Sequence, residues 1–323
     1  MNNLLAAWKE FVNCKRCKID VSNFTRNLLF NIRELNDDLN NKSYCHGEYH
    51  HFKIHDPKSR DIHKALVRDR LLHHAVYRQL YPFFDRTFIF DSYSCRDDKG
   101  THRGFKRFSE FARRASFDHT KTVWVLKCDI RKFFASIDHQ TLFIILERYI
   151  PDANIMWLVK QIIGSFHSTV SGVGLPLGNL TSQLFVNIFL NEFDQYVKHR
   201  LKARWYIRYA DDFVILDQNR VQLESILIEI RQYLHAELKL DLHPDKVSIQ
   251  TFASGVDFLG WVHFIDHLIL RKATEKRMFR NIAIKQNGDL DKFEATMRSY
   301  LGMLSHGNTW KMRTKISCLH SIF

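Results

Sequence analysis

The sequence has little of what marks fibrous, unstructured or membrane-spanning chains. Only 5 prolines and 12 glycines occur among 323 residues, which excludes a collagen-like or linker-rich protein. No apolar run reaches the roughly 18 residues that a membrane helix needs. The N-terminus also lacks the basic segment and clean apolar stretch of a secretory signal. We therefore expect a cytoplasmic protein that does not enter a membrane.

Cysteine is scarce too, with 6 residues scattered along the chain. A chain of this size can bury a core without disulfides, so we expect unpaired thiols in a reducing compartment. Cys14 and Cys17 are spaced like metal ligands, and Cys45 with His46 could complete a zinc set. A single pair of this spacing is weak evidence, and a metal at Cys14 and Cys17 stays open.

Positive charge is what the chain has in excess. The 48 Lys and Arg outnumber the 35 Asp and Glu, which gives a net charge of +13 and favours a polyanionic partner. From Arg271 to Phe323 there are eleven basic and four acidic residues. A solvated helical surface would give the same count. Charge alone does not separate nucleic acid from an anionic membrane or an acidic protein.

Hydrophobic periodicity predicts an α+β protein, in which helices and hairpins surround an antiparallel sheet. Apolar residues make up 45% of the chain, enough for a large buried core. Helical spacing occurs over residues 20–38, from Val67 onward, and over 139–150, 180–201, 221–236 and most of the chain after Thr274. Asp138 is expected to cap one of these helices. Residues 50–62 form a short polar stretch with an expected turn at Pro57.

The expected strands carry the most informative acidic residues. Strand-like runs occupy residues 123–126, 205–209, 213–216, 246–252 and 256–264. The first run leads to Asp129, and the second and third flank Asp211 and Asp212 at a hairpin tip. Aspartate is common in turns, but two adjacent carboxylates repel each other. A cation held with Asp129 as a third ligand would remove that repulsion.

Oxygen ligands of this kind suit Mg²⁺, which binds through carboxylates and substrate phosphates. Two such ions would activate a 3′-hydroxyl and stabilise a leaving pyrophosphate. The carboxylates therefore predict nucleotidyl transfer.

The motifs around these acids resemble those of reverse transcriptases, in an order that holds from about residue 50 to 310. In the palm they are Tyr209-Ala210-Asp211-Asp212, Lys127–Phe134, Gly174–Gln183, His243–Lys246 and Phe258–Trp261. In the fingers they are Asp56-Pro57-Lys58-Ser59-Arg60, Arg68–Arg70 and Asp91–Arg96. A lone YADD box is a weak signal, whereas this ordered set is specific. The resemblance implies an RNA-directed DNA polymerase.

The resemblance also implies a right-hand polymerase fold of the α+β class. An N-terminal segment and the fingers would occupy residues 1–120. The palm, an antiparallel sheet backed by helices, would occupy 121–265 with a helical insertion at about 139–172. A short helical thumb would follow over 266–323.

Several roles follow from the resemblance rather than from the residues alone. Asp129, Asp211 and Asp212, with the Ile130 carbonyl, would bind two Mg²⁺ ions, and Mn²⁺ could replace them. Lys246 would donate a proton to the pyrophosphate, although a surface lysine would look the same.

The same resemblance implies a dNTP site that includes Lys53, Arg60, Arg131, Phe134, Leu177 and Gly178. Lys53 and Arg60 would grip the triphosphate, with a solvated lysine as the alternative for Lys53. Phe134 would be the steric gate that rejects a 2′-hydroxyl, unless it or Phe133 is simply core.

The second palm motif indicates a subtype. Leu177-Gly178 stands where most reverse transcriptases have Gln-Gly, and Ser182-Gln183 follows. This form resembles the reverse transcriptases of diversity-generating retroelements, a group II intron-like bacterial lineage. The resemblance implies error-prone copying of template adenines with a small basic accessory protein, and an apolar side chain there removes a contact that could reject a mispair.

Three other functions stay open. Bacterial antiviral defence reverse transcriptases have similar deviations and would make DNA from a dedicated noncoding RNA scaffold. An idle RNA-binding scaffold is opposed by the three intact aspartates, and an RNA-dependent RNA polymerase by Phe134. In the favoured interpretation the partners are template RNA, the RNA/DNA hybrid and dNTPs.

Overall fold

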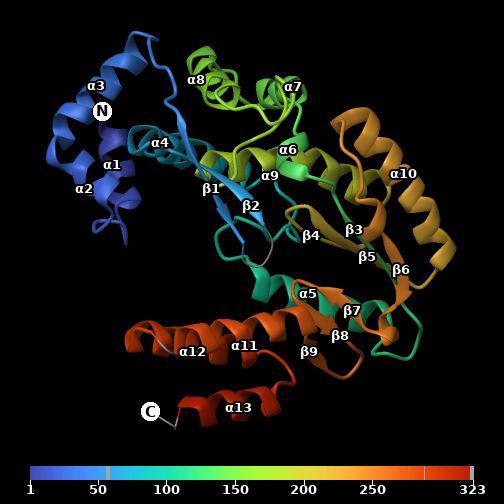
Figure 1. Ribbon diagram of the computed structural model, residues 1–323. Coiled ribbons are helices and arrows are strands. Elements are labelled where there is room, and N and C mark those ends of the chain that lie inside the picture. Colours follow the sequence, from blue (N-terminus) through green and yellow to red (C-terminus); the bar gives the residue numbers. More distant parts are fainter. Residues whose placement is uncertain (56–58, 287, 321–323) are drawn as a thin grey trace.

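The computed structural model describes residues 1–55, 59–286 and 288–320 (Figure 1). Asp56, Pro57 and Lys58, the start of one expected fingers motif, lie outside these ranges. No helix in the described ranges combines the length and the apolar character needed to cross a membrane.

Three N-terminal helices form a group in which the first two pack on a long helix and the third packs on the first two. They are α1 (Asn2–Phe11), α2 (Ile19–Arg26) and α3 (Leu28–Asn40), and the long helix is α4 (Val67–Phe84). A single helix over 20–38 was expected, but the chain leaves helical geometry at Asn27, with φ −118° and ψ 36°. The break allows both Val21 of α2 and Ile32 of α3 to be fully buried in the core.

The segment expected to form the fingers contains a hairpin where the sequence indicated only a polar stretch. Strand β1 (Tyr49–Ile54) pairs antiparallel with β2 (Arg60–Ala65). Most residues of β1 are exposed on both faces, so the alternation of apolar and polar residues that reveals a strand is missing. The hairpin is attached to the palm instead, because the His63 N–H donates to the Leu177 carbonyl at 2.9 Å.

A four-stranded antiparallel sheet lies within the expected palm, in the order β4-β5-β3-β6. Its strands are β3 (Trp124–Asp129), β4 (Trp205–Tyr209), β5 (Asp212–Asp217) and β6 (Ser248–Thr251). Helices α9 (Leu180–Gln195) and α10 (Arg220–Leu238) cover one face, and α5 (Thr101–Ala115) covers the other. Because alternate residues face opposite layers, Phe213 packs in one core and Val214 in the other. This explains why β5 is an unbroken apolar run.

The short helix α6 (Phe133–Ser136) follows β3. Two helices lie within the expected insertion at about 139–172, namely α7 (His139–Tyr149) and α8 (Ala153–Gly164). The expected helix cap is confirmed, since the Asp138 carboxylate accepts a hydrogen bond from the Thr141 N–H at 2.9 Å. The five-residue π-helix Tyr196–Arg200 extends α9.

The C-terminal part has its own small core. A three-stranded sheet of β7 (Val256–Phe258), β8 (Trp261–His263) and β9 (Leu268–Leu270) precedes three helices. These helices are α11 (Lys272–Gln286), α12 (Leu290–Leu304) and α13 (Trp310–His320). Met278, Phe293 and Met297 pack between the helices. Figure 1 shows them at the opposite end of the molecule from α7 and α8.

Candidate active site

Two central strands bring the three expected carboxylates to one edge of the palm sheet. Asp129, the last residue of β3, lies directly opposite Asp212, the first residue of β5. Asp211 precedes it in a two-residue turn in which Ala210 adopts a left-handed φ of 53°. The Asp211 carbonyl accepts a hydrogen bond from the Ile130 N–H at 3.0 Å. The expectation that adjacent strands carry these acids is confirmed.

Asp212 is a partly buried acid with an unusual environment. Its Oδ1 is sealed from solvent and has no hydrogen-bond partner. Burial raises the pKa of this carboxyl to about 6, and the negative charges of Asp129 and Asp211 add to that effect while Lys127 opposes it. A sealed carboxylate oxygen beside two further acids is a place where a cation would be stabilising.

Lys246 lies at this same edge. Its Nζ is 2.6 Å from Asp129 Oδ1, and the Asp129 carbonyl accepts a hydrogen bond from the His243 N–H at 2.8 Å. The short 3₁₀ helix Pro244–Lys246 is thus attached to the end of β3. Lys246 is therefore paired with a protein carboxylate and is not a freely solvated surface lysine. Its role as a proton donor stays a prediction.

The donor chemistry of this edge fits a hard divalent cation such as Mg²⁺ or Mn²⁺, because carboxylate and carbonyl oxygens are what these ions prefer. Within the described residues, no group of three His, Cys, Asp or Glu side chains is already arranged to hold a metal ion. Asp129 is paired with Lys246 instead. Metal binding stays a prediction, supported by the unpartnered Asp212 Oδ1.

The two phenylalanines after β3 differ in their surroundings. Phe133 is 3% exposed and belongs to the core, whereas Phe134 is only partly buried. The Phe134 carbonyl accepts a hydrogen bond from the Leu175 N–H at 2.7 Å, which connects the first and second palm motifs. Phe134 packs against the core but keeps part of its surface exposed, so it stays the candidate for the steric gate.

The second palm motif is attached to the fingers strand β2. Buried Asn179 accepts from the Ala65 N–H at 3.2 Å and donates to the His63 carbonyl at 2.8 Å. Gly178 has a φ of +108°, and a Cβ there would lie 2.8 Å from Ile62 Cγ2. This position therefore needs glycine. Leu177, partly buried, lies at the junction of fingers and palm.

The remaining expected dNTP contacts are spread over two elements. Lys53 and Arg60 lie on the two strands of the fingers hairpin, and Lys53 Nζ is 3.8 Å from Asp61. Arg131 follows β3 with an exposed side chain, and its N–H donates to the Asp241 carbonyl. The contacts of Lys53, Arg60 and Arg131 with a nucleotide stay predictions.

Sequence analysis assigned no role to Arg208. This arginine is fully buried on β4, two residues before the turn, and pairs with buried Asp194 of α9. The centre of β4 is buried on both faces, with Tyr206, Ile207 and Arg208 all fully buried. An arginine within such a run requires a buried partner, and its place between apolar and aromatic neighbours was the available signal.

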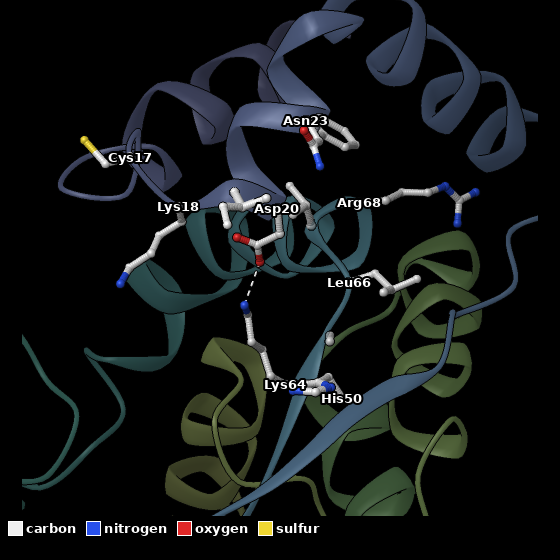
Figure 2. A pocket seen from close by; sticks show the side chains of 12 residues that line it. Cys17, Lys18, Asp20, Asn23, His50, Lys64, Leu66 and Arg68 are labelled. Atoms are coloured by element: carbon white, nitrogen blue, oxygen red, sulfur yellow. Dashed lines mark hydrogen bonds and ion pairs between the residues drawn. The ribbon is translucent and has the colours of Figure 1, made fainter.

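A separate cleft of about 930 Å³ lies between α2 and β2, away from the acidic edge (Figure 2). Asp20 and Lys64 face each other across it, with Nζ 2.6 Å from the carboxylate. Cys17 is in its lining. Cys14, Cys17, Cys45, Cys95 and Cys128 are all free thiols, as expected.

One protein family matches this chain over residues 54–263, and it is described as reverse transcriptase (RNA-dependent DNA polymerase). Among curated proteins, Protein YkfC of Escherichia coli strain K12 is 28% identical over 302 residues, which cover 81% of this chain and 75% of YkfC. The group II intron-encoded protein LtrA of Lactococcus lactis subsp. cremoris is 23% identical over 70% of this chain. The match covers only 47% of LtrA.

Solved structures share the fold. Telomerase from Candida albicans, in complex with a fragment of telomeric RNA, superposes with a TM-score of 0.53 at 12% identity and covers 84% of this chain. Telomerase from Candida tropicalis gives 0.52 at 11% identity over 75% of this chain. The matches span 55% and 60% of those telomerase chains. The expected α+β right-hand polymerase fold is confirmed.

Proposed function

This chain belongs to the reverse transcriptase family, and we propose that it copies a template RNA into cDNA as an RNA-directed DNA polymerase. The observation that carries the proposal is the register of β3 and β5, which pairs Asp129 with Asp212 beside the Asp211 turn. Residues 1–120 would form an N-terminal segment and the fingers, 121–265 the palm and 266–323 the thumb.

The proposed chemistry divides among the residues at the palm edge. Asp129, Asp211 and Asp212, with the Ile130 carbonyl, would hold Mg²⁺, which lowers the pKa of a 3′-hydroxyl and neutralises phosphate charge when bound. The Lys246 ammonium, beside Asp129, would donate a proton to the departing pyrophosphate.

The remaining residues would bind substrate. Lys53, Arg60 and Arg131 would contact the triphosphate. Phe134 would face the sugar of the incoming dNTP, with Leu177 and Gly178 beside it. The basic C-terminal helices would hold the RNA/DNA hybrid through its phosphates.

Primer extension on a defined RNA tests this function. The wild type should incorporate dNTPs in Mg²⁺, and Asp211→Asn should lose roughly 100-fold or more, because a metal ligand loses its charge. Asp217→Asn, at the far end of β5, is the matched control and should retain activity. Equal activity of Asp211→Asn and wild type, or no incorporation by the wild type, would contradict the proposal.

We infer further that copying is error-prone, as in a diversity-generating retroelement, with a small basic accessory protein as partner. Leu177 supports this, since it lies at the fingers–palm junction and cannot make the hydrogen bonds of glutamine. Sequencing cDNA made from the native RNA tests the inference. Adenines copied as accurately as other bases would instead favour a defence enzyme that works on a noncoding RNA.

A further inference from the structure

The guanidinium of Arg208 is completely enclosed, and its contacts match its five N–H groups. Nε donates to Asp194 Oδ1 at 2.7 Å, and Nη2 donates to Asp194 Oδ2 at 2.7 Å and to Ser92 Oγ at 3.1 Å. Nη1 donates to Asn187 Oδ1 at 3.4 Å and to the Ala210 carbonyl at 3.2 Å. No other ionic side chain offers five donors in one plane.

These contacts connect the turn to the most buried parts of the palm. Asn187 and Asp194 belong to α9, which is buried nearly all round. Ser92 lies in the segment before α5, where the Arg208 N–H donates to the Asp91 carbonyl at 3.0 Å. Tyr206 adds a hydrogen bond to Asp194 at 2.7 Å. The side chain of Arg208 is therefore held by α9, by the segment before α5 and by the turn at Ala210.

The hydrogen bond from Arg208 Nη1 to the Ala210 carbonyl differs from the others, because it reaches the turn and not the buried core. Ala210 has a left-handed φ of 53°, a conformation that costs about 1 kcal/mol or more for a residue with a Cβ and needs support from its surroundings. Its carbonyl belongs to the peptide that leads directly into Asp211. The position of that peptide sets where the Asp211 backbone begins.

A buried ion pair is weak evidence for stability, because well-packed apolar residues often replace one without loss. Leucine or methionine could fill the volume of Arg208, but neither could donate to the Ala210 carbonyl. Lysine could pair with Asp194 but could not span Asp194, Ser92, Asn187 and Ala210 together. The arrangement thus does more than hold the core.

We propose that Arg208 is a positioning residue, which together with Asp194 fixes the Ala210 carbonyl and so holds Asp211 and Asp212 where catalysis needs them. The proposal rests on the polymerase function proposed above for the same site. It adds that the contacts of Arg208 with α9, on one face of the sheet, determine the geometry of the turn.

The test compares Arg208→Lys with Arg96→Lys. Arg96 is a suitable control because its side chain is also buried and pairs with Asp85 at 2.6 Å. It donates to the Ile89 carbonyl at 2.7 Å and to the Ser92 carbonyl at 3.1 Å, so it touches the backbone of one Arg208 partner but has no contact with the turn. Both variants should lose thermal stability. Only Arg208→Lys should lower kcat roughly 10- to 100-fold and raise the Mg²⁺ concentration for half-maximal rate, because small displacements of reacting groups are costly.

Amide hydrogen exchange gives a readout that does not depend on activity. The Ile130 N–H donates to the Asp211 carbonyl, so its exchange reports on the turn. In Arg208→Lys this amide should exchange faster relative to amides of α9, and in Arg96→Lys it should not. Equal exchange and an equal Mg²⁺ requirement in the two variants would reduce Arg208 to a structural role.

If Arg208→Lys does not fold, Asn187→Ala replaces it, because this change removes one partner of Nη1. An unchanged Mg²⁺ requirement and unchanged Ile130 exchange in Asn187→Ala would then overturn the proposal. A wild type that incorporates no dNTP would defeat the polymerase function instead, and the exchange experiment would still decide whether Arg208 fixes the turn.

Discussion

The backbone of His63 donates a hydrogen bond to the carbonyl of Leu177 at 2.9 Å, so a fingers strand and the second palm motif share one backbone contact. Asn179 adds two more bonds to the same strand. Residue 177 is thus held by its backbone, and a substitution there changes the side chain at the junction without releasing the segment.

Leu177→Gln should therefore reduce misincorporation, and most at template adenine if the diversity-generating interpretation is correct. A hydrogen bond that discriminates the correct nucleotide is worth about 1–2 kcal/mol, or roughly ten- to thirtyfold in error rate. Sequencing of cDNA from a defined RNA measures this. Leu180→Gln, three residues away, is the control and should leave the errors unchanged.

Phe134→Ala should admit rNTPs, because it removes the partly accessible ring expected beneath the sugar. Competition between rNTP and dNTP in primer extension measures the change. Phe133→Ala is the matched variant. Since Phe133 is 3% exposed, that variant should lose about 3–5 kcal/mol of unfolding free energy and keep its sugar preference. The assignment of Phe134 as the steric gate would be wrong if Phe133→Ala admitted rNTPs and Phe134→Ala kept the wild-type sugar preference.

Replacing Lys276, Arg277 and Arg280 of α11 with alanine should weaken binding to RNA/DNA duplexes of any sequence. Each lost phosphate contact should reduce the slope of log affinity against log salt by roughly 0.7–0.9. Filter binding across a salt series measures the slope. The exposed residues Lys202, Arg204 and Arg220 of the palm form the control set. An unchanged slope in the α11 variant would point to a protein partner.

His73 should make the fold sensitive to acid. It is 1% exposed, and burial lowers its pKa to about 3, with the positive charges of His46, His74 and Arg70 acting in the same direction. Protonation then favours the unfolded chain, so stability is complete above pH ~6.5 and is lost as the pH falls toward 3.

Urea unfolding of wild type and His73→Gln at pH 7.5 and 5.5 measures this contribution. The wild type should lose about 1 kcal/mol more than the variant over that interval. The comparison isolates His73 from His74, whose pKa burial also lowers, to about 4. Equal losses would mean that His73 titrates normally.

Local patterns in the sequence were enough to predict the central strands, the turn between them and one helix cap, whereas the palm was implied by the resemblance to reverse transcriptases. The apolar runs of β3 and β5, the turn between Tyr209 and Asp212 and the cap at Asp138 each depend on neighbours along the chain, and each was confirmed. The β1–β2 hairpin was missed because β1 is exposed on both faces, so its side chains do not alternate between a buried and an exposed side. The partners of Arg208 were missed because Ser92 and Asn187 are distant in sequence, and only the packing of α9 brings them together.

Strand β5 is buried on both faces, with Phe213 in one core layer and Val214 in the other. A single inserted residue anywhere between Asp212 and Asp217 would reverse which side chains enter each layer beyond the insertion. It would also shift the pairing that places Asp212 opposite Asp129. Over evolutionary time this strand can exchange one apolar residue for another of similar volume, but an in-frame gain or loss of one codon would be eliminated. Its length should therefore vary far less than its composition.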